Sequence, residues 1–276
     1  MNDMTALPIA LFDSGVGGLT VLKALRQCLP HEDLLYLGDT ARLPYGTKGP
    51  ETIVRYTLLA ARMLVGRGAK MLVVACNTAT AAALPTLQEA LAPLPVLGVV
   101  EPGARAAAAA SRNGEIVVIA TEATISGGAY QQAIVRIRPE AQVRGRACTL
   151  FVPMAEEGLM HGPLAEGLAH HYLDDIFNPA LTAPRPDTLL LGCTHFPLLQ
   201  TALQNVVGPQ VHIVDSAATT AACVSERLAQ TNLLRPADRP GTSHFMTTDN
   251  RARFVRTGSL FLGERLHNAD VELVDL

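Results

Sequence analysis

The sequence predicts an α/β fold of two similar lobes, each a mainly parallel sheet flanked by helices, with a ligand site in the cleft between them. Short apolar runs alternate with segments of helical spacing, which is the pattern of an α/β protein. These runs are apolar throughout, as expected of parallel strands that are buried on both faces. In addition, one arrangement of apolar strand, cysteine and polar residues occurs twice.

Length and composition agree with this fold class and exclude other classes of protein. A chain of 276 residues is long enough for one large domain or two lobes. With 49% hydrophobic and 17% charged residues, it is not a disordered chain. Only 4% of the residues are aromatic, so Ala, Leu and Val must supply most of the core. The net charge of −3 is not that of a general nucleic-acid binder.

The sequence shows no feature of a secreted or membrane protein. Its acidic N-terminus lacks the basic and apolar regions of a signal peptide. No apolar run approaches the roughly 20 residues needed to cross a bilayer. The five cysteines are odd in number, widely spaced and without a Cys-x-x-Cys pair, which favours reduced thiols. We therefore expect a cytoplasmic protein that does not bind membranes.

The elements are predicted in chain order from the apolar runs and the helical spacing. Helices are expected at 51–67, where Pro50 suits the first turn, at the alanine run 106–110, and at 216–228. Strands are expected at 9–12, 34–37, 71–75, 96–99, 116–120, 188–191 and 211–214, and near 244–247.

The repeated arrangement predicts two related lobes. Residues 72–78 read Leu-Val-Val-Ala-Cys-Asn-Thr, and residues 189–195 read Leu-Leu-Leu-Gly-Cys-Thr-His. Another strand-to-loop exit precedes each of them. We predict that residues 1–98 plus 210–276 form a first lobe containing Cys76, and that residues 99–209 form a second lobe containing Cys193. The chain would cross between the lobes around residues 101–103.

The two repeated cysteines are the strongest candidates for chemistry. Ligands of open α/β sheets bind at the carboxyl ends of strands, and Cys76 and Cys193 both follow a strand. There, at a helix N-terminus, a thiolate is stabilised and the thiol pKa is lowered from about 8.5. One such thiol in each lobe suggests an acid and a base on opposite faces of one carbon. The remaining cysteines are predicted to be small buried residues; they are Cys28, Cys148 and Cys223.

Two loops could bind a small anion at the same edge. The segment 13–18, Asp-Ser-Gly-Val-Gly-Gly, lies between a strand and a helix. It matches neither a dinucleotide fingerprint nor a P-loop. It is a tight turn, a cradle of helix N–H groups for an anion, or both, and Asp13 is available for a cation. The segment 44–46, Pro-Tyr-Gly, is either an ordinary turn or a source of N–H groups for a carboxylate.

Cofactor and metal chemistry have weaker support. Cys76, Cys193 and His195 are possible metal ligands, but structural zinc normally uses closer Cys or His pairs. A second possible cluster, more typical of a solvated helix face, consists of His170, His171, Asp174 and Asp175. None of the three lysines follows a strand in the way that a Schiff-base lysine would. We therefore expect neither a metal nor a cofactor.

Five stretches together resemble the glutamate racemases of the aspartate/glutamate racemase superfamily. The two cysteine motifs are the most specific of them. Ala120 stands where the family usually has Gly, which would change a backbone contact. Phe196 stands where Tyr is commoner, which would change a hydroxyl contact. The stretches are 12–19, 38–46, 74–79, 151–156 and 191–197.

The resemblance implies interconversion of L- and D-glutamate without a cofactor, which supplies D-glutamate for peptidoglycan. One thiolate would remove the α-proton and the opposite thiol would reprotonate the other face. Cys76 would act on D-glutamate and Cys193 on L-glutamate. Asp13 would hold the substrate ammonium or tune Cys76. His195, with Glu156 as its partner, would do the same beside Cys193.

The resemblance also implies a set of substrate-binding residues. Besides Asp13 and His195 they are Ser14, Tyr45, Gly46, Asn77, Thr78, Thr121, Thr124 and Thr194. A homodimer is the default assembly, because closed two-fold assemblies are common. Two rival functions remain: racemisation of aspartate or another acid, and a non-catalytic module that binds a small dicarboxylate or a regulatory partner.

Overall fold

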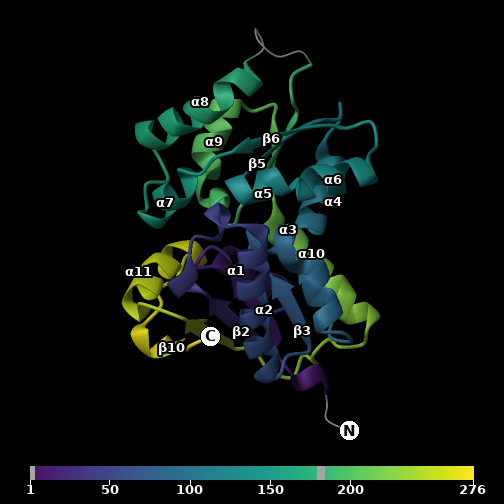
Figure 1. The fold of residues 1–276 in the computed structure, drawn as a ribbon, viewed down its shortest axis with the longest axis vertical. Helices are drawn as coiled ribbons and strands as arrows, with labels where there is room; N and C mark the ends of the chain where they lie inside the picture. The colour runs from purple at the N-terminus through teal and green to yellow at the C-terminus, as the bar shows by residue number, and fades with distance from the viewer. Residues whose placement is uncertain (1–3, 179–183) are drawn as a thin grey trace.

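The first sheet combines strands from both ends of the chain. In the computed structural model, which describes residues 4–178 and 184–276, six strands pair in the order β10-β9-β2-β1-β3-β4. All of these pairings are parallel, and the strand predicted near 244–247 returns to this sheet as β9 (Figure 1). The strands are β1 Ile9–Asp13, β2 Leu34–Gly38, β3 Met71–Val74, β4 Val96–Gly98, β9 Ser243–Thr247 and β10 Val271–Leu273.

The second sheet is also parallel, with the strand order β6-β5-β7-β8. Its strands are β5 Glu115–Ala120, β6 Gln142–Ala147, β7 Thr188–Gly192 and β8 His212–Asp215. The strand predicted at 211–214 is β8, and it pairs with β7 rather than with the first sheet. The predicted boundary at 210 is therefore wrong for this strand, since a strand that follows a short crossover usually lies beside its predecessor.

Helices cover both faces of each sheet. The first sheet carries α1 Leu19–Cys28, α2 Pro50–Gly66, α3 Asn77–Ala90, α10 Ser216–Gln230 and α11 Arg251–Leu262. The second carries α4 Val100–Ala110, α5 Glu122–Gly127, α6 Ala129–Ile137, α7 Phe151–Glu156, α8 Pro163–Phe177 and α9 Gln200–Val207. Short 3₁₀ turns lie at Met4–Ala6, Thr40–Arg42, Tyr45–Thr47, Phe196–Leu199 and Asn268–Asp270. Within the described ranges, no helix is long and apolar enough to span a membrane.

The central strands of both sheets are mostly apolar because each lies between two cores. In β1, Ile9 and Leu11 pack in one hydrophobic cluster, while Ala10 and Phe12 pack in the cluster on the other face. The strand β5 alternates in the same way between two clusters. Successive side chains of a strand point to opposite faces, so both faces of each sheet are buried at these central strands.

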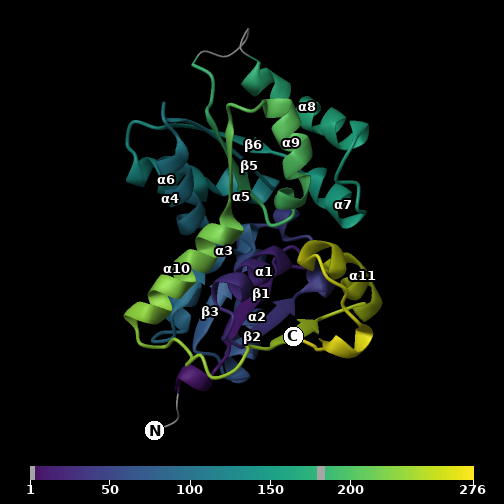
Figure 2. The same cartoon turned by 180° about the vertical axis from the view of Figure 1, so that it is seen from behind.

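The two sheets belong to two lobes that are joined by α4 and α10. The helix α10 packs against both α1 and α4, and it passes from the end of the second sheet into the first lobe (Figure 2). Residues 101–103, predicted as the crossing, lie in the first turn of α4, so the chain leaves the first sheet slightly earlier, after Gly98. Residues 1–3 and 179–183 of the predicted lobes lie outside the described residues.

Two strands have no counterpart in the sequence-based prediction. The strand β6 reads Gln-Val-Arg-Gly-Arg-Ala and is largely exposed at the edge of the second sheet. The strand β10 has three residues and is the edge strand of the first sheet. Edge strands do not need two buried faces, so a search for continuous apolar runs misses them.

The three cysteines predicted to be structural differ in burial. Cys148 is buried and Cys223 is half-buried, but Cys28 is exposed, so the prediction for Cys28 is wrong. The positions of α1 that face the core are Leu19, Val21, Leu22 and Leu25. Cys28 is the last residue of this helix, beyond its buried stripe.

Candidate active site

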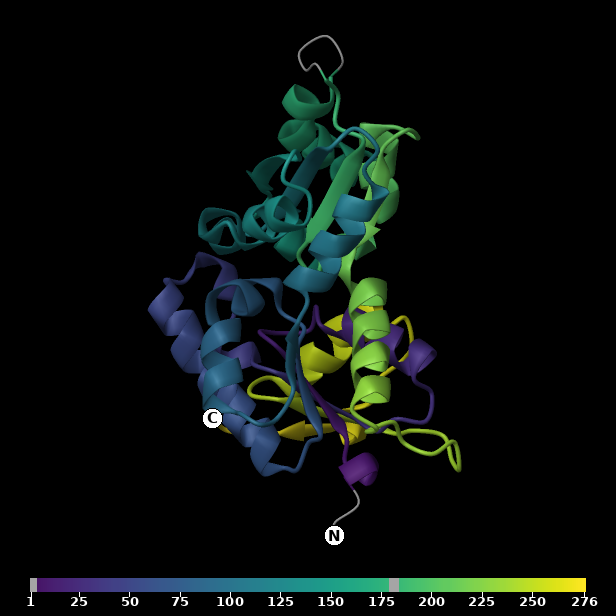
Figure 3. The same cartoon turned by 90° about the vertical axis from the view of Figure 1, so that its right-hand side faces the viewer.

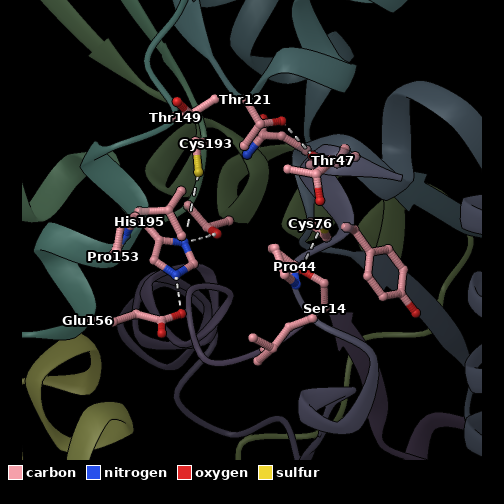
Figure 4. Close-up of a pocket in the computed structure, with 18 residues that line it drawn as sticks. Ser14, Pro44, Thr47, Cys76, Thr121, Thr149, Pro153, Glu156, Cys193 and His195 are labelled. Carbon is pink, nitrogen blue, oxygen red and sulfur yellow. Dashed lines mark hydrogen bonds and ion pairs between the residues drawn. The ribbon is translucent and has the colours of Figure 1, made fainter. Parts of the chain in front are cut away.

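A cavity of about 280 Å³ lies at the carboxyl ends of the strands, between the two lobes. Loops that follow β1, β2, β3, β5 and β7 all contribute to its lining. Figure 4 shows Cys193, His195 and Glu156 on one side and Cys76 and Ser14 on the other. This volume is at the lower end of the range for ligand pockets, so the cavity suits a small molecule. The predicted residues that line it are Ser14, Tyr45, Gly46, Cys76, Asn77, Thr78, Thr121, Glu156, Cys193, Thr194 and His195.

Two of the predicted site residues lie behind this lining. The Thr124 hydroxyl hydrogen-bonds to those of Thr78 and Thr121, at 3.1 and 3.0 Å, and is buried. Asp13 ends β1 and is 1% exposed. Its Oδ2 accepts from the Gly15 amide at 2.9 Å, whereas its Oδ1 is buried without a partner. The structure thus places Thr124 as a support of the lining and leaves Asp13 with one unpaired acceptor atom.

Cys76 lies at the N-cap of α3. Its sulfur is 3.4 Å from Ser14 Oγ, within hydrogen-bond distance, and accepts from the Ala79 amide at 3.4 Å. The Ala79 amide at the helix N-terminus does lower the pKa of this thiol, but the net pKa is not lowered as predicted. Burial, followed by the charge of Asp13, raises the pKa of Cys76 to about 12, and these effects outweigh the two hydrogen bonds, which lower it.

Cys193 lies next to a chain of charged groups. Its sulfur is 3.8 Å from Nδ1 of His195, and Nε2 of His195 is 3.2 Å from Glu156 Oε1. Glu156 Oε2 accepts from Arg253 of α11 at 3.1 Å. The ring of Phe261, also from α11, packs edge-on against His195, with 4.9 Å between ring centroids. The expected pairing of Glu156 with His195 is therefore present, and a helix of the first lobe supports it.

The neighbouring Cys193 and Glu156 keep the His195 imidazole protonated. Burial lowers its pKa, but the hydrogen bonds and charges of Cys193 and Glu156 outweigh burial and raise the pKa of His195 to about 10. Burial raises the pKa of Glu156, yet His195 and Arg253 lower it overall. At neutral pH a positive imidazolium therefore lies between the Cys193 sulfur and a carboxylate.

This arrangement predicts a pH dependence of stability. The pKa of His195 is about 6.5 in an unfolded chain and about 10 in the fold, so the folded chain binds more protons between these values. Its contribution to stability is complete below about pH 6.5 and is lost as the pH rises through about 10. We expect the difference in unfolding free energy between wild type and His195→Asn to shrink from pH 6 to pH 10.

Urea unfolding of wild type and His195→Asn across this pH range measures the difference in unfolding free energy. Groups that titrate in the same way in both proteins do not contribute to this difference. The exposed His161, replaced by Asn, serves as the matched control. A difference that stays constant or grows with pH contradicts the charged state assigned to His195.

Hydrogen-bond donors are also available in the cavity. Asn77 is 3% exposed, and its Nδ2 has no partner, while its Oδ1 accepts a hydrogen bond. The Tyr45 hydroxyl donates to Asp39 Oδ2 at 2.7 Å, so its hydrogen bond lies within the first lobe. A buried donor without a partner is costly, which makes the Asn77 amide suited to an anionic ligand.

Several lining residues were not predicted from the sequence. They are Gly15, Leu43, Pro44, Thr47, Thr149, Val152 and Pro153. Most lie within or next to the motifs at 38–46 and 151–156. Their position near these motifs could have identified them as lining residues. Arg253 and Phe261 carry no such signal, because only the fold brings α11 to His195.

The alternative metal sites do not form. Among the described residues, no three His, Cys, Asp or Glu side chains lie close enough to hold a metal ion. His170 and Asp174 form an exposed pair, 2.7 Å apart, on α8. This second cluster is therefore a solvated helix face.

The chain is similar to known racemases over most of its length. The family model Asp/Glu/Hydantoin racemase matches residues 19–224. The glutamate racemase of Geobacter metallireducens is 52% identical over 268 residues, covering 97% of this chain and 96% of that protein.

Solved structures give the same result over almost the whole chain. The glutamate racemase from Thermus thermophilus, in complex with β-chloro-D-alanine, matches with a TM-score of 0.87 and 43% identity over 99% of this chain and 98% of that one. The enzyme from Francisella tularensis, in complex with D-glutamate, matches with a TM-score of 0.88 and 33% identity over 98% of both chains. The chain therefore belongs to the Asp/Glu/Hydantoin racemase family, among its glutamate racemases.

Proposed function

We propose that this chain interconverts L- and D-glutamate without a cofactor, with Cys76 and Cys193 as the acid and the base. The observation that carries the proposal is the position of one thiol from each lobe on opposite sides of a small cavity (Figure 4). The full-length similarity to glutamate racemases supports glutamate as the substrate. The reaction supplies D-glutamate for peptidoglycan, and we place it in the cytoplasm.

The reaction needs one thiolate and one thiol at a time. The thiolate takes the α-proton from one face of the substrate and becomes a thiol, which leaves a carbanion. The opposite thiol gives its proton to the other face and becomes a thiolate. The product is the mirror image of the substrate, and the reverse reaction uses the same two groups in exchanged roles.

The surroundings of the two sulfurs differ in a way that suits these roles. With its raised pKa, Cys76 is a thiol in this structure, and thus a proton donor. The His195 cation lies beside Cys193, where negative charge has to be carried. We assign removal of the α-proton of L-glutamate to Cys193 and that of D-glutamate to Cys76. Electrostatic stabilisation of the carbanion supplies further rate enhancement.

The polar groups of the cavity suit the charges of glutamate. The unpaired Oδ1 of Asp13 is an acceptor for the substrate ammonium, and a cation there would offset the charge that raises the pKa of Cys76. The unpaired Nδ2 of Asn77, at the start of α3, is a donor for a carboxylate. We assign the carboxylates also to Ser14, Thr78, Thr121 and Thr194, with Thr124 in support, and to the backbone of Tyr45 and Gly46.

Proton NMR in D₂O provides the direct test. Purified protein with a reducing agent and a chelator, and no cofactor, is incubated with L-glutamate and then with D-glutamate. We expect loss of the α-proton signal and appearance of the opposite enantiomer in both cases. An unchanged α-proton from folded protein with free thiols overturns the proposal. Exchange on aspartate in place of glutamate identifies the other substrate, and calorimetric binding without exchange identifies a binding module.

We also propose a homodimer and the two-lobe division, with the boundary moved from 210 to the end of β8 at Asp215. Light scattering of the purified chain measures the assembly. A monomer at micromolar concentration contradicts the dimer but leaves the reaction unaffected, since both thiols belong to one chain.

A further inference from the structure

The side-chain amide of Asn77, a residue that lines the cavity, has one particular orientation. A side-chain amide has a donor end and an acceptor end, and the two orientations would offer opposite groups to a carboxylate. Here the Oδ1 accepts from the Tyr130 hydroxyl at 2.5 Å, and the Nδ2 remains unpartnered at the cavity lining. The orientation of Asn77 therefore depends on Tyr130.

Tyr130 is a residue of the second lobe that reaches into the first. It belongs to α6, is fully buried, and does not line the cavity. Asn77 begins α3 of the first lobe, so this hydrogen bond crosses between the lobes. Burial raises the pKa of Tyr130, so the hydroxyl keeps its proton at neutral pH.

The other side of Tyr130 contacts the segments that join the lobes. The side chain of Ser216, the first residue of α10, lies near the Tyr130 hydroxyl and lowers its pKa. In α4, a Cβ at Gly103 would lie 3.2 Å from the Tyr130 ring and 3.4 Å from Ser216 Cβ. Figure 3 shows α4 (blue-teal) and α10 (light green) adjacent where the two lobes meet.

We propose that Tyr130 is a positioning residue of the substrate site, which fixes the Asn77 amide with its donor toward the substrate and links it to the junction of the lobes. The Tyr130 hydroxyl donates to Asn77 Oδ1. A tyrosine hydroxyl has a single proton, so this bond occupies the oxygen end of the amide and leaves the Asn77 NH₂ as the end without a partner. The inference rests on the proposed function for the identity of the bound carboxylate.

The hydroxyl can be removed with little change in shape by Tyr130→Phe. Asn77 Oδ1 then loses its donor, and the amide can turn its oxygen toward the substrate carboxylate. We expect the KM for glutamate and the dissociation constant for D-glutamate, measured by calorimetry, to rise about tenfold, as for loss of one hydrogen bond to a charged group. The kcat should change less than the KM, because Tyr130 touches neither thiol in the described contacts.

A double-mutant cycle separates positioning from general destabilisation. If Tyr130 acts through Asn77, the Tyr130→Phe change has little further effect on ligand binding in an Asn77→Ala background. Effects that multiply in the double variant, or an unchanged dissociation constant in Tyr130→Phe, overturn the inference. Tyr172→Phe is the matched control, since the Tyr172 hydroxyl contacts the Leu150 amide, outside the site.

The outcome is distinguishable from failure of the proposed function. If wild type does not racemise glutamate, the α-proton exchange experiment shows it before any variant is made. If wild type racemises glutamate and Tyr130→Phe binds it normally, only the inference about Tyr130 fails. Thermal unfolding of Tyr130→Phe and Tyr172→Phe confirms that both variants are folded at the assay temperature.

Discussion

Cys76→Ser and Cys193→Ser are each expected to slow glutamate racemisation by roughly 10²–10⁴-fold, the usual contribution of a general acid or base. Serine has nearly the shape of cysteine, but its hydroxyl is a much weaker acid than a thiol, so it cannot exchange a proton with the α-carbon at a useful rate. Circular dichroism of glutamate during turnover measures the loss. Cys28→Ser is the matched control, since Cys28 is exposed at the end of α1.

Partial reactions then assign each thiol to one enantiomer. Two enantiomers have equal free energy in water, so kcat/KM for overall racemisation must fall by the same factor in both directions. Removal of the α-proton alone is not bound by this constraint. We expect Cys193→Ser to retain elimination from a D-glutamate analogue with a leaving group next to the α-carbon, and to lose it for the L-analogue. Cys76→Ser should behave in the opposite way. Normal racemisation by both variants contradicts the two-thiol mechanism.

Gly17→Ala is expected to reduce activity by about 10²-fold, although residue 17 carries no functional side chain. A Cβ at this position would overlap Thr194 Oγ1 and lie 2.6 Å from His195 Nδ1. The loop after β1 can approach the second lobe this closely only without a side chain. A shift of about 1 Å in a catalytic group is enough for a loss of this size, and overpacking costs about 1–3 kcal/mol of stability.

Glycine 66 provides the matched control for this substitution. A Cβ at Gly66 would meet no heavy atom within 4 Å, so Gly66→Ala should retain full activity. Steady-state kinetics and thermal unfolding of both variants give the comparison. Activity of Gly17→Ala within about twofold of wild type would show that His195 does not need its present position against this loop.

The α/β class, most strands and the two candidate cysteines could be predicted from the sequence. Buried parallel strands must be apolar on both faces, so they are visible as continuous runs such as residues 9–12 and 188–191. The carboxyl ends of parallel strands meet at one edge of a sheet, and the repeated motif predicted two facing lobes with one such edge each, so Cys76 and Cys193 were expected in one cavity, where they lie. These features depend on local chain pattern alone.

The groups that support the two thiols could be identified only in the folded chain. Arg253 reaches Glu156, and Phe261 reaches His195, because α11, late in the chain, packs against the second lobe. Tyr130 reaches Asn77 across the junction of the lobes. The raised pKa of Cys76 reflects burial and the nearby Asp13, which the helix N-terminus alone did not reveal. Such contacts join residues far apart in sequence, and their energies depend on distance and desolvation, which no local pattern records.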